Sequence, residues 1–327
     1  MNGLPHPAAD GWCLDRSGTK RTHHLTVYAK SRHRIPIFWT AHAPMSLQLL
    51  PDPAAIARAA ELIESADAII IAAGAGMGVD SGLPDFRGNE GFWKAYPALA
   101  RARLEFTRIA SPSAFERNPQ LAWGFYGHRL KLYRDTHPHA GFGILKDWGE
   151  SKPNGWAVFT SNVDGQFQKA GFTDDPIDEC HGSIHHLQCL KPCCNDIWPA
   201  NGFEPEIDHD NCLLLNAPPT CPRCGGLARP NILMFGDGGW LDERESRQSQ
   251  ALDNWLRNCR RPVVIEMGAG TAIASVRAFS HQVIRHANGR LVRINPRESD
   301  VPTTNDVGLA TGALTGLRLI QRCLETG

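Results

Sequence analysis

Short runs of apolar residues bounded by turn formers recur along the chain, and longer polar or amphipathic stretches separate them. The first run, Asp67 to Ala72, reads Asp-Ala-Ile-Ile-Ile-Ala. Apolar residues at nearly every position are typical of a strand buried on both faces of a parallel sheet. Comparable runs lie near residues 156, 262 and 290, so the pattern predicts an α/β fold with a mostly parallel sheet. Asp52-Pro53 precedes an alanine-rich stretch, which predicts a capped helix that begins there.

A glycine-rich loop follows the first strand. Residues 73–88 read Ala-Gly-Ala-Gly-Met-Gly-Val-Asp-Ser-Gly-Leu-Pro-Asp-Phe-Arg-Gly. Gly74, Gly76 and Gly78 let the backbone turn tightly and bring its N–H groups close to a phosphate. A Gly-x-Gly pattern also occurs in loops that bind nothing, so the residues that follow carry more weight.

Those residues argue against a dehydrogenase. Such an enzyme continues into a helix and carries an acidic residue about 20 positions on, which holds the ribose. Pro84 interrupts that helix, and the chain around Pro97 offers no such acid. Arg87 instead provides a fixed cation suited to a pyrophosphate, and Phe86 an aromatic ring suited to covering a nicotinamide or a sugar.

Residues 74–87 resemble the sirtuin signature Gly-Ala-Gly-x-Ser-x-x-Ser-Gly-Ile-Pro-Asp-Phe-Arg, with Gly78 in place of the usual Ser. Three further segments resemble the family in the same order, so the resemblance covers residues 50–325. It implies a Rossmann-like, mostly parallel sheet with helices on both faces, a small inserted zinc-binding module and a small helical module. In this loop it implies NAD contacts from Gly74, Ala75, Gly76, Asp85, Phe86 and Arg87.

The second segment, Thr160-Ser161-Asn162-Val163-Asp164, resembles the family's Thr-Gln-Asn-Ile-Asp. It follows an apolar run, and open α/β sheets bind ligands at the carboxyl ends of their strands. The resemblance implies that Asn162 orients the ribose and the attacking water, and that Asp164 hydrogen-bonds the nicotinamide side of the site. Ser161 replaces a Gln that contacts the ribose. Taken alone, Asn and Asp after a strand are better explained by an Asx turn.

His181 and Gly182 match the family's His-Gly dipeptide. An ordinary histidine has a pKa near 6.5, so it can accept a proton at physiological pH. Because the chain has 14 histidines, any one of them alone is better explained by a structural role. His181 stands out because it lies between the Asn-Asp segment and a cysteine cluster, and the resemblance implies that it is the catalytic base.

The last part of the chain completes the resemblance. Gly270-Thr271 is similar to the family's Gly-Thr-Ser turn, which implies a contact with the NAD phosphates or ribose, and Asn295 is similar to an Asn that touches the adenosine ribose. Residues 229–237 are similar to a stretch that pairs with an extended substrate peptide, which implies that Phe235 and Gly236 line the acyl-lysine tunnel. Strand addition of this kind asks little of the peptide sequence.

The cysteines indicate a metal. Ten cysteines in 327 residues without a secretory signal favour reduced thiols and metal ligation over disulfides. Cys221 and Cys224 have the two-residue spacer of half a zinc site. Cys189 lies at the family's first ligand position, and either Cys193 or Cys194 completes the set; we favour Cys193 because its loop is shorter. Four thiolates leave no position for water, so we expect a structural zinc.

The acyl preference has two interpretations. Ala110, Tyr126 and Arg129 stand at the spacing found in the sirtuin branch that prefers acidic acyl groups. On a helix, positions 126 and 129 share a face, so a phenol and a guanidinium can converge on one carboxylate. A packed aromatic and a solvated charge would explain the same residues, and the enzyme would then be a general deacetylase.

Charge and hydropathy exclude other classes. The 34 Lys and Arg balance 34 Asp and Glu, which argues against direct nucleic-acid binding by bulk charge. No apolar run reaches about 18 residues, so no membrane span is expected. Without an apolar h-region secretion is disfavoured, and we expect a cytoplasmic protein.

The same patterns suggest the domain boundaries. Residues 1–45 are polar and rich in His and Arg, and we expect a disordered extension rather than a targeting arm. The catalytic domain then spans residues 46–327, with its Rossmann-like core at about 46–182 and 231–327 and the zinc module at about 183–230.

The combined prediction is an NAD-dependent protein-lysine deacylase. By the resemblance it acts on acyl-lysine proteins and yields free lysine, nicotinamide and O-acyl-ADP-ribose. An ADP-ribosyltransferase or NADase on the same fold is an alternative, which the changes at Gly78 and Ser161 favour slightly. A non-enzymatic NAD or acyl-lysine sensor is a second alternative, and Asn162, Asp164 and His181 together count against it.

Overall fold

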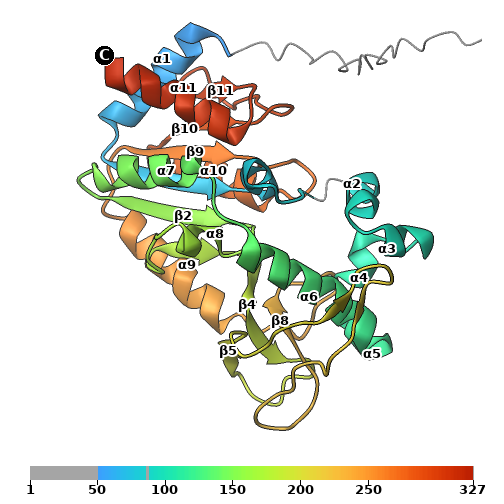
Figure 1. The fold of residues 1–327 in the computed structure, drawn as a ribbon. Helices are drawn as coiled ribbons and strands as arrows, with labels where there is room; N and C mark the ends of the chain where they lie inside the picture. The colour runs from blue at the N-terminus through green and yellow to red at the C-terminus, as the bar shows by residue number, and fades with distance from the viewer. Residues whose placement is uncertain (1–50, 86–87, 327) are drawn as a thin grey trace, which may run out of the picture. The chain divides into compact units, whose positions relative to one another are not determined.

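The computed structural model describes residues 51–85 and 88–326, so the expected extension over residues 1–45 lies outside the described part. A six-stranded sheet has the order β11-β10-β9-β1-β2-β3, and every neighbouring pair is parallel (Figure 1). After β1 the chain adds β2 and β3 on one side of it, and β9, β10 and β11 then follow on the other side. The strands are β1 (Ala68–Ala73), β2 (Trp156–Thr160), β3 (Ile177–Glu179), β9 (Pro262–Met267), β10 (Arg290–Ile294) and β11 (Val307–Leu309).

Helices cover both faces of this sheet because the side chains of β1 alternate between two cores. Ile69 and Ile71 pack into the core under α1, α7 and α11, whereas Ile70 and Ala72 pack into the core under α10. Figure 1 shows α1 beside α11, and the two helices are in contact. The predicted α/β fold with a parallel sheet is therefore confirmed. A further helix, α9 (Glu243–Leu256), covers β2 and β3. The bounds of the other helices are α1 (Pro53–Ser65), α7 (Ala140–Glu150), α10 (Ser275–His286) and α11 (Ala313–Thr326).

The predicted helix start is also confirmed. Pro53 occupies the first helical position of α1, and the side chain of Asp52 accepts a hydrogen bond of 3.1 Å from the backbone N–H of Ala54. Such a cap satisfies a backbone donor that has no partner within the helix.

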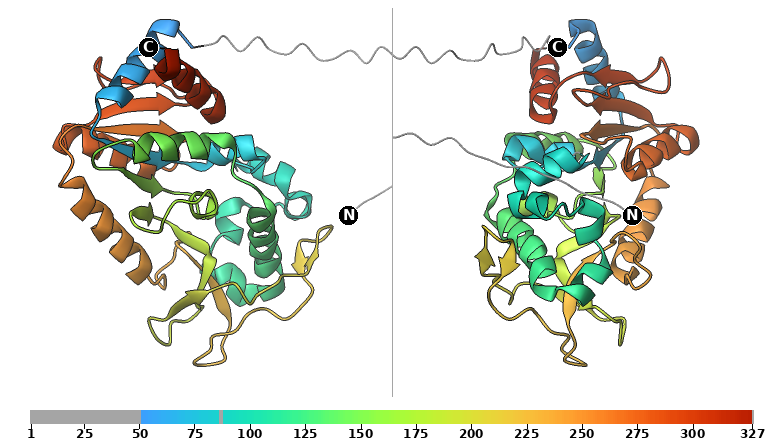
Figure 2. Two further views of the ribbon diagram at one scale, coloured as in Figure 1. Left: turned by 60° about the vertical axis from the view of Figure 1, so that its left-hand side comes forward. Right: turned by 90° about the vertical axis from the view of Figure 1, so that its right-hand side faces the viewer.

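A third core joins five helices to a second, smaller sheet (Figure 2). The helices are α2 (Gly88–Ala95), α3 (Pro97–Arg101), α4 (Phe106–Ile109), α5 (Pro112–Arg117) and α6 (Pro119–Asp135). The sheet has the order β5-β4-β8, with β4 (Gly182–Cys189), β5 (Ile197–Pro199) and β8 (Ala228–Ile232). The division into a core and a module over residues 183–230 stays a prediction.

The remaining elements are short. They are the 3₁₀ helix η1 (Ala75–Ser81), α8 (Gln166–Lys169), β6 (Ile207–Asp208) and β7 (Leu213–Leu214). In the described part of the chain, no helix has both the length and the apolar character that crossing a membrane requires.

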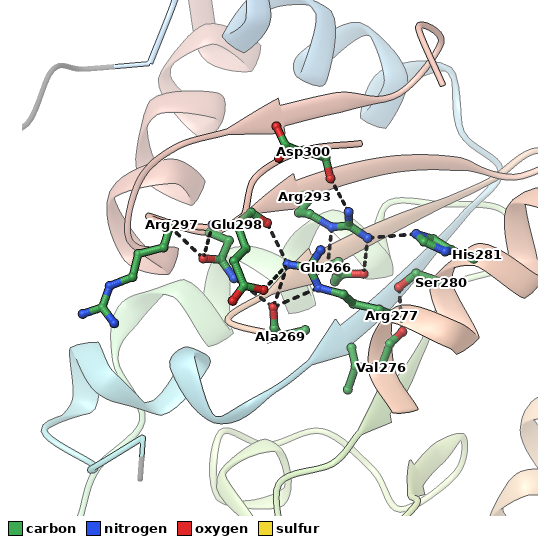
Figure 3. Close-up of polar contacts among 11 residues, drawn as sticks. Glu266, Ala269, Val276, Arg277, Ser280, His281, Arg293, Arg297, Glu298 and Asp300 are labelled. Carbon is green, nitrogen blue, oxygen red and sulfur yellow. Dashed lines mark hydrogen bonds and ion pairs between the residues drawn. The ribbon is translucent and has the colours of Figure 1, made fainter. Parts of the chain in front are cut away.

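A buried ion pair links β9 to β10 (Figure 3). Glu266 and Arg293 are register partners on the two strands. The guanidinium binds the carboxylate through two contacts of 2.5 and 3.0 Å, and the side chains are 3% and 1% exposed. Arg293 also donates to the backbone carbonyl of Asp300, so the pair connects the sheet to the loop after β10.

We expect Glu266→Leu to lower the free energy of unfolding by about 3–5 kcal/mol, because it leaves the Arg293 charge buried without its partner. The double variant Glu266→Leu/Arg293→Met should recover most of that loss. Urea unfolding followed by circular dichroism measures both. A loss below about 1 kcal/mol for the single variant would contradict burial of the pair.

Candidate functional site

The site is built where the strand order reverses, between β1 and β9. Open α/β sheets bind ligands at such a switch point, at the carboxyl ends of the strands. The two loops that leave these strands touch through their backbones: Gly74 N–H donates to Met267 at 2.9 Å, and Gly76 N–H to Gly268 at 3.1 Å. A Cβ on Gly74 would lie 2.8 Å from the Cα of Ala269, so only glycine fits.

The loop after β2 is hydrogen-bonded to the loop after β1. The Asn162 side-chain amide donates to the Gly74 carbonyl at 3.1 Å, and the backbone N–H of Asn162 donates to the Thr160 hydroxyl at 3.0 Å. Asp164 is 9% exposed, and its carboxylate accepts a bond of 3.0 Å from the backbone N–H of Gln166. This is the Asx turn that the local pattern suggests, and it holds the carboxylate in place.

His181 follows the next strand, β3, and faces the same region. Its Nε2 lies 3.2 Å from the hydroxyl of Ser275, at the start of α10. The backbone then turns at Gly182, which has a φ of +78°, and a Cβ there would lie 2.1 Å from the Asn231 carbonyl. Gly182 thereby lets β4 run against β8 directly behind the histidine.

One cavity of about 490 Å³ collects most of the predicted residues. It is bounded by the loops after β1, β2 and β3, by α6 and by the segment after β8. The predicted site residues that line it are Ala75, Asp85, Ala110, Tyr126, Arg129, Ser161, Asn162, Asp164, His181, Phe235 and Gly236.

The other predicted NAD contacts do not line this cavity. Gly74 and Gly76 lie after β1, Gly270 and Thr271 after β9, and Asn295 after β10. Phe86 and Arg87 lie outside the described residues. The roles of all these residues stay predictions.

Burial shifts the pKa values of Asp164 and His181 in opposite directions. It raises the pKa of Asp164 to about 6, and Glu179 adds to this effect while the bond from the Gln166 backbone opposes it. Burial lowers the pKa of His181, against a hydrogen bond to the Ser161 backbone. His181 is therefore neutral at pH 7, which is the form that a base requires.

The lining of this cavity combines aromatic rings with a buried cation. Arg129, on α6, is 8% exposed and donates two hydrogen bonds of 3.1 and 2.8 Å to the hydroxyl of Tyr133. Its guanidinium carbon lies 5.8 Å from the centre of the Tyr126 ring. Burial raises the pKa of Tyr126 to about 12, so its hydroxyl keeps its proton and can donate.

The segment after β8 closes one side of the cavity. Leu233 N–H donates to the His181 carbonyl and Phe235 N–H to the Ala110 carbonyl, each at 3.0 Å. The segment is held from behind by an ion pair of 2.8 Å between Arg229 and Asp237, whose side chains are fully buried. The Asp237 carboxylate also accepts from the backbone N–H of Met234 at 3.2 Å, which fixes the turn.

The side chain of Asn295, in the loop after β10, forms hydrogen bonds within the protein. This side chain is 1% exposed and donates to the Ala269 carbonyl at 2.9 Å. Its oxygen accepts from the backbone N–H groups of Arg297 and Glu298, each at 3.0 Å. Asn295 therefore joins the loops after β9 and β10, in addition to any contact with a ribose.

Four cysteines come together beyond the second sheet. The Sγ atoms of Cys189, Cys193, Cys221 and Cys224 all lie within 4.8 Å of one another. Cys189 is 3.7 Å from Cys224, and Cys193 is 3.6 Å from Cys221. Four sulfurs at about 2.3 Å around a tetrahedral zinc would be separated by about 3.8 Å, so this set fits the ion. Cys194 is not a member of the group of four.

Sequence reasoning missed three residues that the structure puts beside the predicted ones. Tyr133 binds Arg129 from one helical turn away, a spacing that local pattern alone can suggest. Thr160 fixes the loop of Asn162. Ser275 contacts His181 across the fold, and no local pattern relates the two.

Comparisons with known proteins agree with this geometry. A model of the Sir2 family matches residues 74–255. The chain is 30% identical over 252 residues to the NAD-dependent protein deacylase of Aquifex aeolicus (strain VF5), covering 77% of this chain and 93% of that protein. It is 28% identical to the NAD-dependent protein deacylase of Thermococcus kodakarensis, covering 77% and 89%. Among solved structures, a Sir2 homologue in complex with NAD matches with a TM-score of 0.60 at 22% identity, over 82% of this chain and 94% of that one.

A parallel sheet with glycine loops at its switch point, joined to a helical module and a four-cysteine module, defines a class of α/β nucleotide-binding proteins. Within that class, the chain belongs to the Sir2 family. The family resemblance read from the four sequence segments is therefore confirmed.

We expect Cys193→Ser to abolish zinc binding and Cys194→Ser to leave it at about one ion per chain, because a tetrahedral site needs all four thiolates. Elemental analysis of the purified variants measures the zinc. The two variants are matched, since they make the same change at adjacent positions. Zinc loss in Cys194→Ser alone would contradict the assignment.

Proposed function

We propose that this protein is an NAD-dependent protein-lysine deacylase. The observation that carries the proposal is the convergence of Asn162, Asp164 and His181 on one cavity that Arg129 also lines. Curated relatives over most of the chain's length carry the same activity in their names.

Each of the three residues has a position that suits its role. The Asn162 amide is fixed by the Gly74 carbonyl, so it can orient a ribose hydroxyl or a water. The Asp164 carboxylate is fixed by the Gln166 backbone and can accept from a nicotinamide amide. His181 is neutral at pH 7 because burial lowers its pKa, so it can take a proton from a hydroxyl.

The residues present fit NAD and zinc. The close backbone approach at Gly74 leaves no room for a Cβ, and such loops offer N–H groups to phosphates. When bound, NAD supplies the electrophilic ribose carbon and the hydroxyls that take over the acyl group. The four cysteines would hold zinc with no open coordination position, so its role is structural.

The mouth of the cavity suits an acyl-lysine peptide. Leu233, Phe235 and Ile273 line it and are 41%, 42% and 51% exposed. Apolar side chains exposed together at a cavity are typical of a surface that binds a partner. The segment of residues 233–236 has Leu233, Phe235 and Gly236 exposed and Met234 buried, so an extended chain can contact the exposed positions along it.

We further propose that the preferred acyl group carries a carboxylate, as in succinyl, malonyl or glutaryl. Arg129 is 8% exposed and lines the same cavity as His181. A buried guanidinium at the end of a tunnel gains a charge-assisted bond from an acidic acyl group and none from acetyl. Tyr133 positions Arg129 by accepting from both its Nε and Nη2 atoms.

Mass spectrometry of the products tests the activity. We expect NAD and a succinyl-lysine peptide to yield free lysine, nicotinamide and O-succinyl-ADP-ribose. His181→Ala should lower this rate at least a hundredfold while zinc content and circular dichroism persist, because general-base catalysis typically contributes about 10²–10⁴-fold. Consumption of NAD without peptide turnover would indicate the NADase or transferase alternative. Full activity of His181→Ala would remove the base assignment.

We expect Arg129→Met to lower kcat/KM for a succinyl-lysine peptide by about 10–100-fold and to leave that for the acetyl peptide within about twofold. Tyr133→Phe should lower the succinyl value by a smaller factor, since it removes one partner that positions the guanidinium and keeps the charge. Lys131→Met is the control, because it removes an exposed charge from the same helix. Equal losses for both peptides would mean that Arg129 and Tyr133 serve folding and not specificity.

A further inference from the structure

A second cavity lies between α9 and α10, on the side of the sheet away from α1, α7 and α11. Its volume is about 670 Å³. Buried residues at its base come from β3, α9 and α10, and exposed residues at its rim come from α9 and α10. We call it the α9–α10 groove; its lining includes Phe159, Asp178, Leu252, Ser275, Phe279 and Val283.

Asp178 is the unusual residue of this groove. It is 1% exposed, and its Oδ1 atom has no hydrogen-bond partner. A buried acceptor left in this state costs about 1–3 kcal/mol, and more for a charged group. A ligand that supplied the missing hydrogen-bond donor would remove this cost.

The charges around Asp178 are predominantly acidic. Burial raises its pKa to about 7, Glu245 and Asp253 add to the rise, and a hydrogen bond from Ser249 opposes it. The basic residues that line the groove, Arg257 and His286, are both exposed. Because a nearby positive charge favours the ionised form of a carboxylate, a bound cation would find a buried partner in Asp178.

The remaining wall is apolar and aromatic. The rings of Phe159 and Phe279 are stacked with centroids 4.0 Å apart and an angle of 4° between them. Leu252 and Val283 are 1% and 2% exposed and lie alongside. Small-molecule sites typically combine such walls with one or two polar groups.

We propose that the α9–α10 groove is a second ligand site, which takes an organic cation with its ammonium group on Asp178 and its apolar body against Phe279 and Leu252. The site is distinct from the deacylase cavity, and it does not depend on the proposed function.

The groove also reaches the residue that contacts the deacylase base. Ser275 lines the groove, and its hydroxyl lies 3.2 Å from Nε2 of His181. A ligand that reaches Ser275 is therefore separated from the imidazole by a single side chain. This makes the His181 ring a reporter of occupancy that needs no turnover.

Calorimetric titration of the full chain with phenethylamine tests the proposal, with 2-phenylethanol as the neutral probe of the same shape. We expect the amine to bind at least tenfold more tightly than the alcohol. Asp178→Asn should weaken amine binding at least tenfold while leaving the alcohol unchanged, because it removes the charge and keeps the volume. Equal affinity for the two probes, or undiminished amine binding by Asp178→Asn, would overturn the proposal.

A second pair of variants guards against a folding artefact and against binding elsewhere. Ala278 and Arg285 are both exposed on α10, but only Ala278 lines the groove. Ala278→Trp should block the amine, and Arg285→Trp should not. The amine should also shift the imidazole resonances of His181 in the wild type. Binding that persists in Ala278→Trp would locate the amine outside the groove and reject the site.

Discussion

The contact between two glycine loops is the constraint on which the site depends. The loop after β1 and the loop after β9 meet backbone to backbone, and a Cβ on Gly268 would lie 2.4 Å from the backbone of Gly76. Because no side chain separates them, the carboxyl ends of two strands from distant parts of the chain form one surface of N–H and carbonyl groups. Asn162 binds that surface through the Gly74 carbonyl, so the loop after β2 is aligned by the same contact.

Two buried ion pairs hold the segments around these glycine loops in place. Arg229 and Asp237 hold the segment that forms one wall of the cavity, and Glu266 and Arg293 hold the two strands on the nucleotide side. A buried pair contributes little net stability, but loss of one partner is costly, so such pairs specify a single arrangement. Arg129 is buried too, and it lines the cavity.

The local sequence pattern was sufficient to predict structural features that depend on residues close together in the sequence. The runs at β1, β2, β9 and β10 are rich in apolar residues because each strand is covered on both faces, and each run begins within one residue of where the sequence places it. The Asp52 cap and the shared face of Tyr126 and Arg129 on α6 follow from helical geometry. Most of the candidate site followed from loops at strand ends, since a parallel sheet gathers those ends at one edge.

The sequence by itself determined four strands of the large sheet, the start of α1, the glycine loops and the family, because each of these rests on spacing along the chain. Only the tertiary structure decided that Cys193 and not Cys194 joins the other three thiols. It alone brought Ser275 to His181 and left Asp178 buried in a groove between two helices. These are contacts between residues far apart in sequence, and they depend on how the helices pack on the sheet, which leaves no periodic signal in the order of amino acids.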